Sequence, residues 1–243
     1  MSGLAGRPPL AVTADLDDTL FAQHDYLDGA WRDVAAAAAR RGIPGEPLRA
    51  ALCEIASLGS DRGQIIDRAL AACGIPAQPD LIADLVGAFR AHRPAVLTPY
   101  PGITDALWQL REVVPVGCVT DGDPQIQRAK IAALGLADAF DVIVISDETG
   151  RPFRKPHPVP FLMALHALGV VAADAVHIGD RPEKDVAGPR RLGMRAIRVM
   201  TGEYAATPNG DSPPDLTFED AASAMQAIRD AALAGASRRV SRH

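Results

Sequence analysis

The chain has 243 residues, of which 48% are hydrophobic and 23% are charged, and its formal net charge is -5. This composition is ordinary for a folded globular protein and excludes the disordered and collagen-like classes. The negative balance provides no basic surface for a phosphodiester backbone, so we expect small-molecule chemistry and no nucleic-acid partner. The length allows one core domain and a smaller second module.

The cysteines and the apolar stretches indicate the cellular compartment. Cys53, Cys73 and Cys118 lie far apart, without the spacing of a zinc or redox motif. The first residues lack the apolar stretch of a signal peptide, and no segment approaches the roughly 18 apolar residues of a membrane span. We therefore expect a cytoplasmic protein without a membrane partner, and the oligomeric state stays open.

Five short apolar runs predict the strands of a parallel sheet. They cover residues 9–14, 113–119, 142–145, 175–178 and 195–199. Helical segments separate most of these runs, and such alternation is typical of crossover connections. The predicted fold class is α/β, with a doubly wound, Rossmann-like sheet of five parallel strands and helices on both faces.

The connection after the first run is unusually long and contains no convincing strand. Residues 21–97 are alanine-rich and amphipathic, and they indicate about four helices. We therefore expect a core domain of residues 1–20 and 98–235 and a helical domain of residues 21–97. One more helix is predicted over about 219–233, and a disordered tail over 236–243.

Polar side chains follow three of the predicted strands. They lie in the segments 15–19, 120–122 and 179–180, and Lys155 lies in the loop after the third strand. Ligands of open parallel sheets bind at the carboxyl ends of the strands. We therefore expect these groups to converge at one edge of the sheet.

The carboxylates in this set indicate a metal site. Asp15, Asp17, Asp180 and Asp185 would repel one another, so either some of them are protonated or a cation holds them together. Oxygen ligands favour Mg²⁺, which leaves room in its octahedral shell for a phosphate oxygen. With Lys155, the ion would supply positive charge where a phosphoryl group binds.

This charge arrangement would allow an aspartate to attack a phosphate ester. Asp15 is the expected covalent nucleophile, which forms and then loses an acyl phosphate. Asp17 lies two residues further on, where it can protonate the departing alcohol and later accept a proton from water. The Thr120 hydroxyl can hold the non-bridging phosphate oxygens.

The same residues resemble the motifs of the haloacid dehalogenase superfamily of hydrolases, in its phosphatase form. The family's Asp-x-Asp-x-Thr motif matches residues 15–19, and its strand ending in Thr or Ser matches Thr120. Its Lys-Pro motif matches Lys155 and Pro156, and its Gly-Asp motif with a later acid matches residues 179–185. All four motifs occur in the family's order.

The resemblance implies a role for each matching residue. Asp15 is the nucleophile and Asp17 the general acid and base, while Thr120 and Lys155 bind the phosphate. Mg²⁺ would be held by Asp15, the backbone carbonyl of Asp17 and Asp180, with Asp185 in direct contact or one step removed. The helical domain of residues 21–97 resembles the family's helical cap, which closes over the site and selects substrates.

Residue 121 departs from the family pattern, because many relatives have asparagine where this chain has Asp121. We place Asp121 with Thr120 and Lys155 among the substrate-binding residues. The alternative is that Asp121 only fixes the turn before the helix that starts near Pro124.

The expected function is a Mg²⁺-dependent phosphomonoesterase that acts on a sugar phosphate, a nucleotide or a biosynthetic intermediate. A phosphomutase would use the same Asp15 and Asp17 but return the phosphoryl group to its substrate. A dehalogenase needs no acid at the position of Asp17, which argues against that activity. A non-catalytic binding protein is the remaining alternative, and the intact set of acids together with Lys155 argues against it.

Overall fold

The structure is a computed structural model that describes residues 8–60 and 63–240. Its contacts divide the chain into two compact units. The first is formed by the described residues of Met1–Ala22 and Thr98–His243, and the second is Gln23–Leu97. The first unit contains a sheet and the second contains helices only, so each is described by itself.

A parallel sheet forms the centre of the first unit. Its strands are β1 (Ala11–Ala14), β2 (Val116–Thr120), β3 (Val142–Ile145), β4 (Ala175–Gly179), β5 (Arg195–Val199) and β6 (Leu216–Phe218). They are ordered β3-β2-β1-β4-β5-β6, and every neighbouring pair is parallel. The predicted α/β fold class is confirmed, with six strands in place of five. The additional strand, β6, has only three residues, too few to show a pattern in the sequence.

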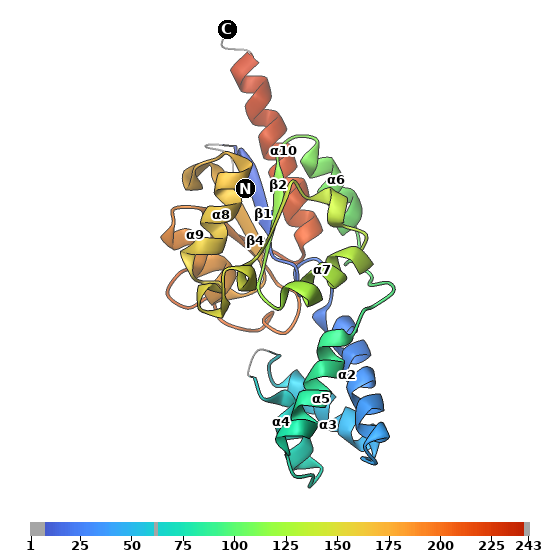
Figure 1. Ribbon diagram of the computed structural model, residues 1–243. Helices are drawn as coiled ribbons and strands as arrows, with labels where there is room; N and C mark the ends of the chain where they lie inside the picture. The colour runs from blue at the N-terminus through green and yellow to red at the C-terminus, as the bar shows by residue number, and fades with distance from the viewer. Residues whose placement is uncertain (1–7, 61–62, 241–243) are drawn as a thin grey trace. The chain divides into compact units, whose positions relative to one another are not determined.

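Most residues of the strands are apolar or β-branched, which favours buried parallel strands. All residues of β1, β2 and β4 are buried, as expected of central strands between two helical layers. The helices of this unit are α6 (Ile103–Arg111), α7 (Pro124–Ala133), α8 (Pro158–Leu168), α9 (Gly188–Arg191) and α10 (Ala221–Val240). Helices α6 and α10 pack on each other, as do α8 and α9, and the two pairs flank the sheet (Figure 1).

Short helical turns occupy several loops of the same unit. The turns η1 (Ala137–Ala139), η2 (Ser146–Glu148), η3 (Arg151–Phe153) and η4 (Ala172–Asp174) are 3₁₀ helices, and η5 (Pro182–Ala187) is a π-helix. The π-helical turn follows β4 directly and contains Asp185. π-helical turns are rare in proteins, and those that occur often lie at functional sites.

The strand order reverses between β1 and β4, the two central strands. The chain proceeds from β1 through β2 to β3 on one side of the sheet, and through β4, β5 and β6 on the other. Ligands of doubly wound sheets bind where the strand order reverses in this way. The loops after β1 and β4 border this point.

The second unit is helical. It consists of α2 (Gln23–Arg40), α3 (Gly45–Ser57), α4 (Ile65–Ala72) and α5 (Pro79–Ala91). The helices share a core of buried apolar side chains that includes Trp31, Leu48, Leu52, Leu70 and Leu85. This unit therefore has a hydrophobic core of its own.

The carboxyl-terminal helix is longer than the sequence predicts. Helix α10 runs to Val240, so the expected disordered tail is wrong for residues 236–240, while residues 241–243 lie outside the described part. Residues 236–240 include no glycine or proline, and alanine and arginine favour helix, so nothing in them stops the helix. Among residues 8–60 and 63–240, no helix combines the length and apolarity of a membrane span.

Candidate active site

Two neighbouring strands bring Asp15 and Asp180 to the same edge of the sheet. Asp15 follows β1, and its backbone N–H donates to the carbonyl of Ile178 in β4 at 2.9 Å. Asp180 follows β4 and is fully buried, and its Oδ1 accepts a hydrogen bond from the Thr19 hydroxyl at 3.4 Å. The parallel register of β1 and β4 therefore fixes the first and fourth motifs beside each other.

Asp185 completes a cluster of three carboxylates. One ligand oxygen each of Asp15, Asp180 and Asp185 lies within 4.8 Å of the others, and all three residues are buried. Gly179 makes this approach possible, because a Cβ atom there would lie 2.4 Å from the Cβ of Asp185. The π-helical turn that follows β4 thus folds Asp185 back over a position that only glycine can occupy.

The Lys155 ammonium bridges two carboxylates of this cluster. It donates to Asp15 Oδ1 at 2.5 Å and to Asp185 Oδ1 at 2.7 Å, and Lys155 is itself buried. The backbone N–H of Arg181 donates to Asp185 Oδ2 at 3.1 Å. Both oxygens of Asp185 are therefore engaged.

A buried histidine continues this network. His177 Nε2 lies 3.3 Å from Asp185 Oδ1, and Nδ1 lies 2.8 Å from the Thr13 hydroxyl. Burial lowers the pKa of His177, so the ring is neutral near pH 7. An ionised carboxylate can only accept, so Nε2 carries the hydrogen and Nδ1 accepts from Thr13. His177 therefore orients Asp185, consistent with its place inside β4.

Burial and neighbouring charges shift the pKa values of the three carboxyl groups in different directions. Burial, opposed by Lys155, raises the pKa of Asp15 to about 7. Burial, with the nearby Asp185 and Asp15, also raises the pKa of Asp180 well above its usual range. Burial acts the same way on Asp185, but Lys155 and His177 outweigh it and hold the pKa of Asp185 below its usual range. One lysine therefore does not balance three buried carboxylates.

One oxygen of the cluster lacks a protein partner. Asp180 Oδ2 is buried and accepts no hydrogen bond within the part of the chain that the structure describes. Buried polar atoms are normally paired, and an exception calls for a missing water or ion. This oxygen, the excess negative charge and the oxygen-only donor set fit a Mg²⁺ ion beside Asp15 and Asp180.

The Asp17 carboxylate contacts two side chains of α7. Lys130 Nζ donates to Asp17 Oδ1 at 2.6 Å, and Gln127 Nε2 donates to Asp17 Oδ2 at 2.9 Å. Gln127 Nε2 also donates to the Thr120 hydroxyl oxygen at 2.5 Å. Asp17 and Thr120 are thus joined through one amide group of α7.

Asp121 binds protein groups with both of its oxygens. Its Oδ1 accepts from the Ser146 hydroxyl at 2.7 Å and from the backbone N–H of Lys155 at 3.0 Å. Its Oδ2 lies 3.2 Å from the Lys184 ammonium. These contacts tie the loop after β2 to the loops that carry Lys155 and Asp185, so they favour a loop-fixing role for Asp121 over the expected contact with substrate.

Asp18 shapes the first motif. It is 5% exposed and has a left-handed backbone with a φ angle of 57°. Its carbonyl accepts from the Thr201 hydroxyl, and its Oδ2 accepts from the backbone N–H of Glu203 at 3.3 Å. Asp18 therefore anchors the loop after β5 to the first motif.

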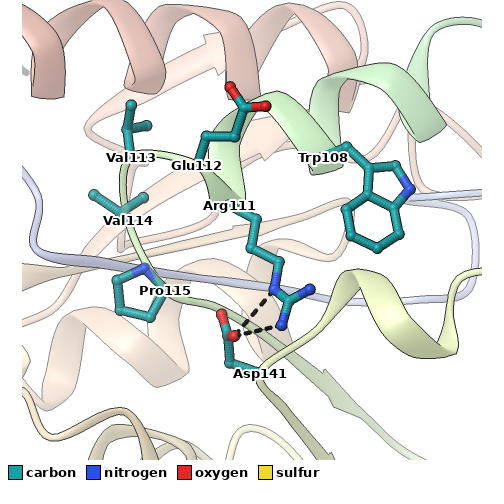
Figure 2. Close-up of a pocket in the computed structure, with 7 residues that line it drawn as sticks. All are labelled: Trp108, Arg111, Glu112, Val113, Val114, Pro115 and Asp141. Carbon is teal, nitrogen blue, oxygen red and sulfur yellow. Dashed lines mark hydrogen bonds and ion pairs between the residues drawn. The ribbon is translucent and has the colours of Figure 1, made fainter.

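A separate hollow lies at the amino ends of β2 and β3, at the other end of the strands from the carboxylate cluster. It has a volume of about 570 Å³ and lies between the end of α6, the segment before β2 and Asp141, which precedes β3 (Figure 2). Arg111 pairs with Asp141 there at 3.0 Å, and Asp141 Oδ2 accepts from the backbone N–H of Val116 at 2.8 Å. This hollow is separate from the carboxylate cluster, since its lining residues lie at the amino ends of β2 and β3.

The structure thus brings together Asp15, Lys155, Asp180 and Asp185, and places Asp17 and Thr120 in a second group around Gln127. Gln127 and Lys130 are additional residues of this site that were not among the residues predicted from the sequence. A signal was available, because Lys130 stands four residues after the buried Ile126 and so interrupts the apolar face of α7.

The chain is similar in sequence to a known family and to named proteins. A family model described as haloacid dehalogenase-like hydrolase matches residues 10–193. The chain is 34% identical to a glyceraldehyde 3-phosphate phosphatase from Methanopyrus kandleri, over 91% of this chain and 98% of that protein. It is 33% identical to a phosphoserine phosphatase from Thermus thermophilus, over 81% of this chain and 72% of that protein.

A solved structure has a fold similar to that of this chain. A 2-haloacid dehalogenase from Pseudomonas syringae pv. Tomato superposes with a TM-score of 0.63 and 27% identity, over 90% of this chain and 96% of that chain. The expectation of a hydrolase of the phosphatase type is confirmed by the named relatives. The extent of the family match shows that the chain belongs to the haloacid dehalogenase-like hydrolases.

Proposed function

We propose that this hydrolase is a Mg²⁺-dependent phosphomonoesterase that transfers the phosphoryl group of a small metabolite to Asp15 and then to water. The observation that carries the proposal is the buried cluster of Asp15, Asp180 and Asp185 with the Lys155 ammonium between two of its members. A phosphate oxygen is attracted to such a site only when a cation offsets the carboxylates.

The residues that would hold Mg²⁺ are Asp15, Asp180 and the backbone carbonyl of Asp17. The unpartnered Oδ2 of Asp180 supports this assignment. Asp185 lies beside the same position, but both of its oxygens accept hydrogen bonds, so we assign it a contact through water and the positioning of Lys155. When bound, the ion supplies positive charge that reduces the repulsion between Asp15 and the phosphate.

The reaction proceeds in two displacements at phosphorus. An oxygen of Asp15 attacks, the bond between phosphorus and the ester oxygen breaks, and Asp17 gives its proton to the departing alcohol. A water molecule then attacks the phosphoaspartate and transfers a proton to Asp17, while the bond from phosphorus to Asp15 breaks. Inorganic phosphate leaves, and Asp15 and the protonated Asp17 are regenerated.

Lys155 and Thr120 hold the transferring phosphoryl group. The Lys155 ammonium is already fixed by two carboxylates, so it needs no rearrangement to donate its remaining hydrogen toward a phosphate oxygen. The Thr120 hydroxyl accepts from Gln127, which leaves its own hydrogen directed elsewhere and available to the substrate. A substrate contact of Asp121 is the weakest part of the set, because its oxygens already have protein partners.

The names of similar proteins support a substrate class. The similar proteins carry the names glyceraldehyde 3-phosphate phosphatase and phosphoserine phosphatase, and both named substrates are three-carbon monophosphates. We propose a compact phosphorylated metabolite of this kind, and we assign substrate selection to the helical unit Gln23–Leu97 as a cap.

A dehalogenase is the competing activity, because several structural neighbours bear that name. A halide leaves without a proton, so its displacement needs no acid in the position of Asp17 and no cation beside the nucleophile. The hydrogen bonds that Lys130 and Gln127 donate to Asp17, and the cluster of three carboxylates, have no use in that reaction. They favour phosphoryl transfer.

The test is phosphate release from glyceraldehyde 3-phosphate, phosphoserine, other sugar phosphates and nucleotides, with Mg²⁺ and with a chelator. We expect release that needs Mg²⁺, is abolished in Asp15→Asn, and is strongly slowed in Asp17→Asn. Turnover of Asp15→Asn near the wild-type rate would disprove the covalent mechanism. Return of the phosphoryl group to the substrate without release would identify a phosphomutase.

A further inference from the structure

Two side chains of α7 hold both oxygens of the Asp17 carboxylate. Lys130 donates to Oδ1 at 2.6 Å and Gln127 donates to Oδ2 at 2.9 Å. The two residues are three positions apart in sequence, so they project from the same face of the helix. The carboxylate is therefore fixed in both position and plane.

Lys130 is built into the protein interior. It is 3% exposed, and its ammonium lies 6.0 Å from the centre of the Phe21 ring, on the face of that ring. Lysine is rarely buried without a carboxylate partner, and here that partner is Asp17. An ordinary surface role does not explain a lysine in this place.

Gln127 extends the clamp to the phosphate-binding loop. It is 1% exposed, and its Nε2 reaches the Thr120 hydroxyl at 2.5 Å as well as Asp17. Gly122 leaves space for it, because a Cβ atom there would lie 3.3 Å from Cδ of Gln127, in a backbone with a φ angle of +132°. The Gln127 side chain thus packs against the backbone of the second motif at Gly122.

We infer that Lys130 and Gln127 are positioning residues that set the Asp17 carboxylate beside Thr120 for proton transfer in both displacements. The inference rests on the proposed function, in which Asp17 is the general acid and base. Proton transfer requires the carboxylate within hydrogen-bond reach of the reacting oxygen. A side chain that is free to rotate would spend most of its time elsewhere, and a displacement of about 1 Å can cost about 100-fold in rate.

The second displacement provides the most selective test. Nitrophenolate leaves p-nitrophenyl phosphate without a proton, so the first displacement on this substrate does not need Asp17 as an acid. Breakdown of the phosphoaspartate still needs Asp17 as a base. A variant with a misplaced Asp17 should therefore release one equivalent of nitrophenolate rapidly and then stall.

The experiment is stopped-flow nitrophenolate release by the full chain with Mg²⁺, for wild type, Lys130→Met, Lys130→Arg and the control Arg128→Met. Arg128 lies on the same helix with a side chain that is 63% exposed, paired with Glu148. We expect Lys130→Met to keep the rapid phase, to lose about 100-fold in steady-state kcat, and to accumulate phosphoprotein. Its kcat/KM should stay close to the wild-type value, because KM falls together with the rate of phosphoaspartate breakdown. Lys130→Arg should recover part of the steady-state rate, and Arg128→Met should match wild type.

Two results would overturn the inference. One is a Lys130→Met variant that turns over like Arg128→Met. The other is a loss of both kinetic phases in proportion, or a rise in KM alone, which would show that Lys130 supports only the fold or substrate binding. If Lys130→Met does not fold, as judged by thermal melting, Gln127→Leu is scored by the same two phases and decides.

A parallel measurement on Asp17→Asn separates this inference from the proposed function. Stalling of Asp17→Asn together with normal turnover of Lys130→Met would refute the positioning role alone. Normal turnover of Asp17→Asn would refute the acid and base role of Asp17, and with it the proposed mechanism.

Discussion

Replacing Lys155 by methionine should destabilise the metal-free protein strongly. The ammonium is 2.5 Å from Asp15 Oδ1 and 2.7 Å from Asp185 Oδ1, and the side chains involved are at most 7% exposed. The variant keeps the volume of the side chain but leaves two buried carboxylates without their cation. Removal of one partner from a buried ion pair costs about 3–5 kcal/mol in the free energy of unfolding.

Urea unfolding in the presence of EDTA measures this loss. With a urea dependence of roughly 2 kcal/mol per molar, the midpoint should fall by about 2 M. The chain has two tryptophans, Trp31 in the helical unit and Trp108 in the sheet unit. A Trp31→Phe background makes the fluorescence of Trp108 report on the sheet unit alone.

A matched control and a metal titration complete this test. Arg128→Met removes a charge from an exposed pair and should cost less than about 1 kcal/mol. Saturating Mg²⁺ should restore part of the stability of Lys155→Met, because the ion supplies positive charge at the same carboxylates. An unchanged midpoint for Lys155→Met in EDTA would refute the view that Lys155 compensates buried negative charge.

Three further predictions concern the same unit. Mg²⁺ should raise the Tm of wild type by a concentration-dependent amount in differential scanning fluorimetry, and an equal rise in Asp180→Asn would contradict the proposed ligand set. Gly179→Ala should lower the free energy of unfolding by about 1–3 kcal/mol in urea and reduce phosphate release, because the new Cβ would lie 2.4 Å from that of Asp185; wild-type values would show that the turn can move aside. The hydrogen bonds from Arg154 lower the pKa of Asp147 below its ordinary value of 3.8, so the stability they add is present above pH 3.8 and is lost as the pH falls through the lowered pKa. Asp147→Asn should therefore be less stable than wild type at pH 7 and equal to it in acid, and a difference in urea midpoint that persists in acid would argue against the ion pair.

Much of the fold could be predicted from local sequence. The five runs of apolar residues that give β1 to β5 are recognisable because parallel strands between two helical layers are buried on both faces. The sixth strand was not predicted because it has three residues, two of them only partly buried and one exposed. A charged, terminal segment such as 236–240 predicts disorder, whereas the preceding helix continues through it to Val240.

The sequence by itself also determined which residues lie at the carboxyl ends of the strands, where we propose the active site. Asp15, Thr120 and Asp180 end or follow β1, β2 and β4, and the carboxyl ends of parallel strands lie on one edge whatever the details of packing. The approach of Asp15 to Asp180 therefore needed only a correct strand assignment.

Only the tertiary structure decided which side chains hold these groups in place. Lys130 is 113 positions from Asp17, and Asp121 meets Ser146 and Lys155 from neighbouring loops. Such pairs depend on how far each helix and loop is rotated about its own axis, and hydrophobic periodicity locates a face only within a broad sector. Hydrogen bonds require atomic positions within a few tenths of an ångström. The hydrogen bonds that hold Asp17 and the loop contacts of Asp121 are therefore determined by the packing of helices and loops on the sheet, which only the tertiary structure shows.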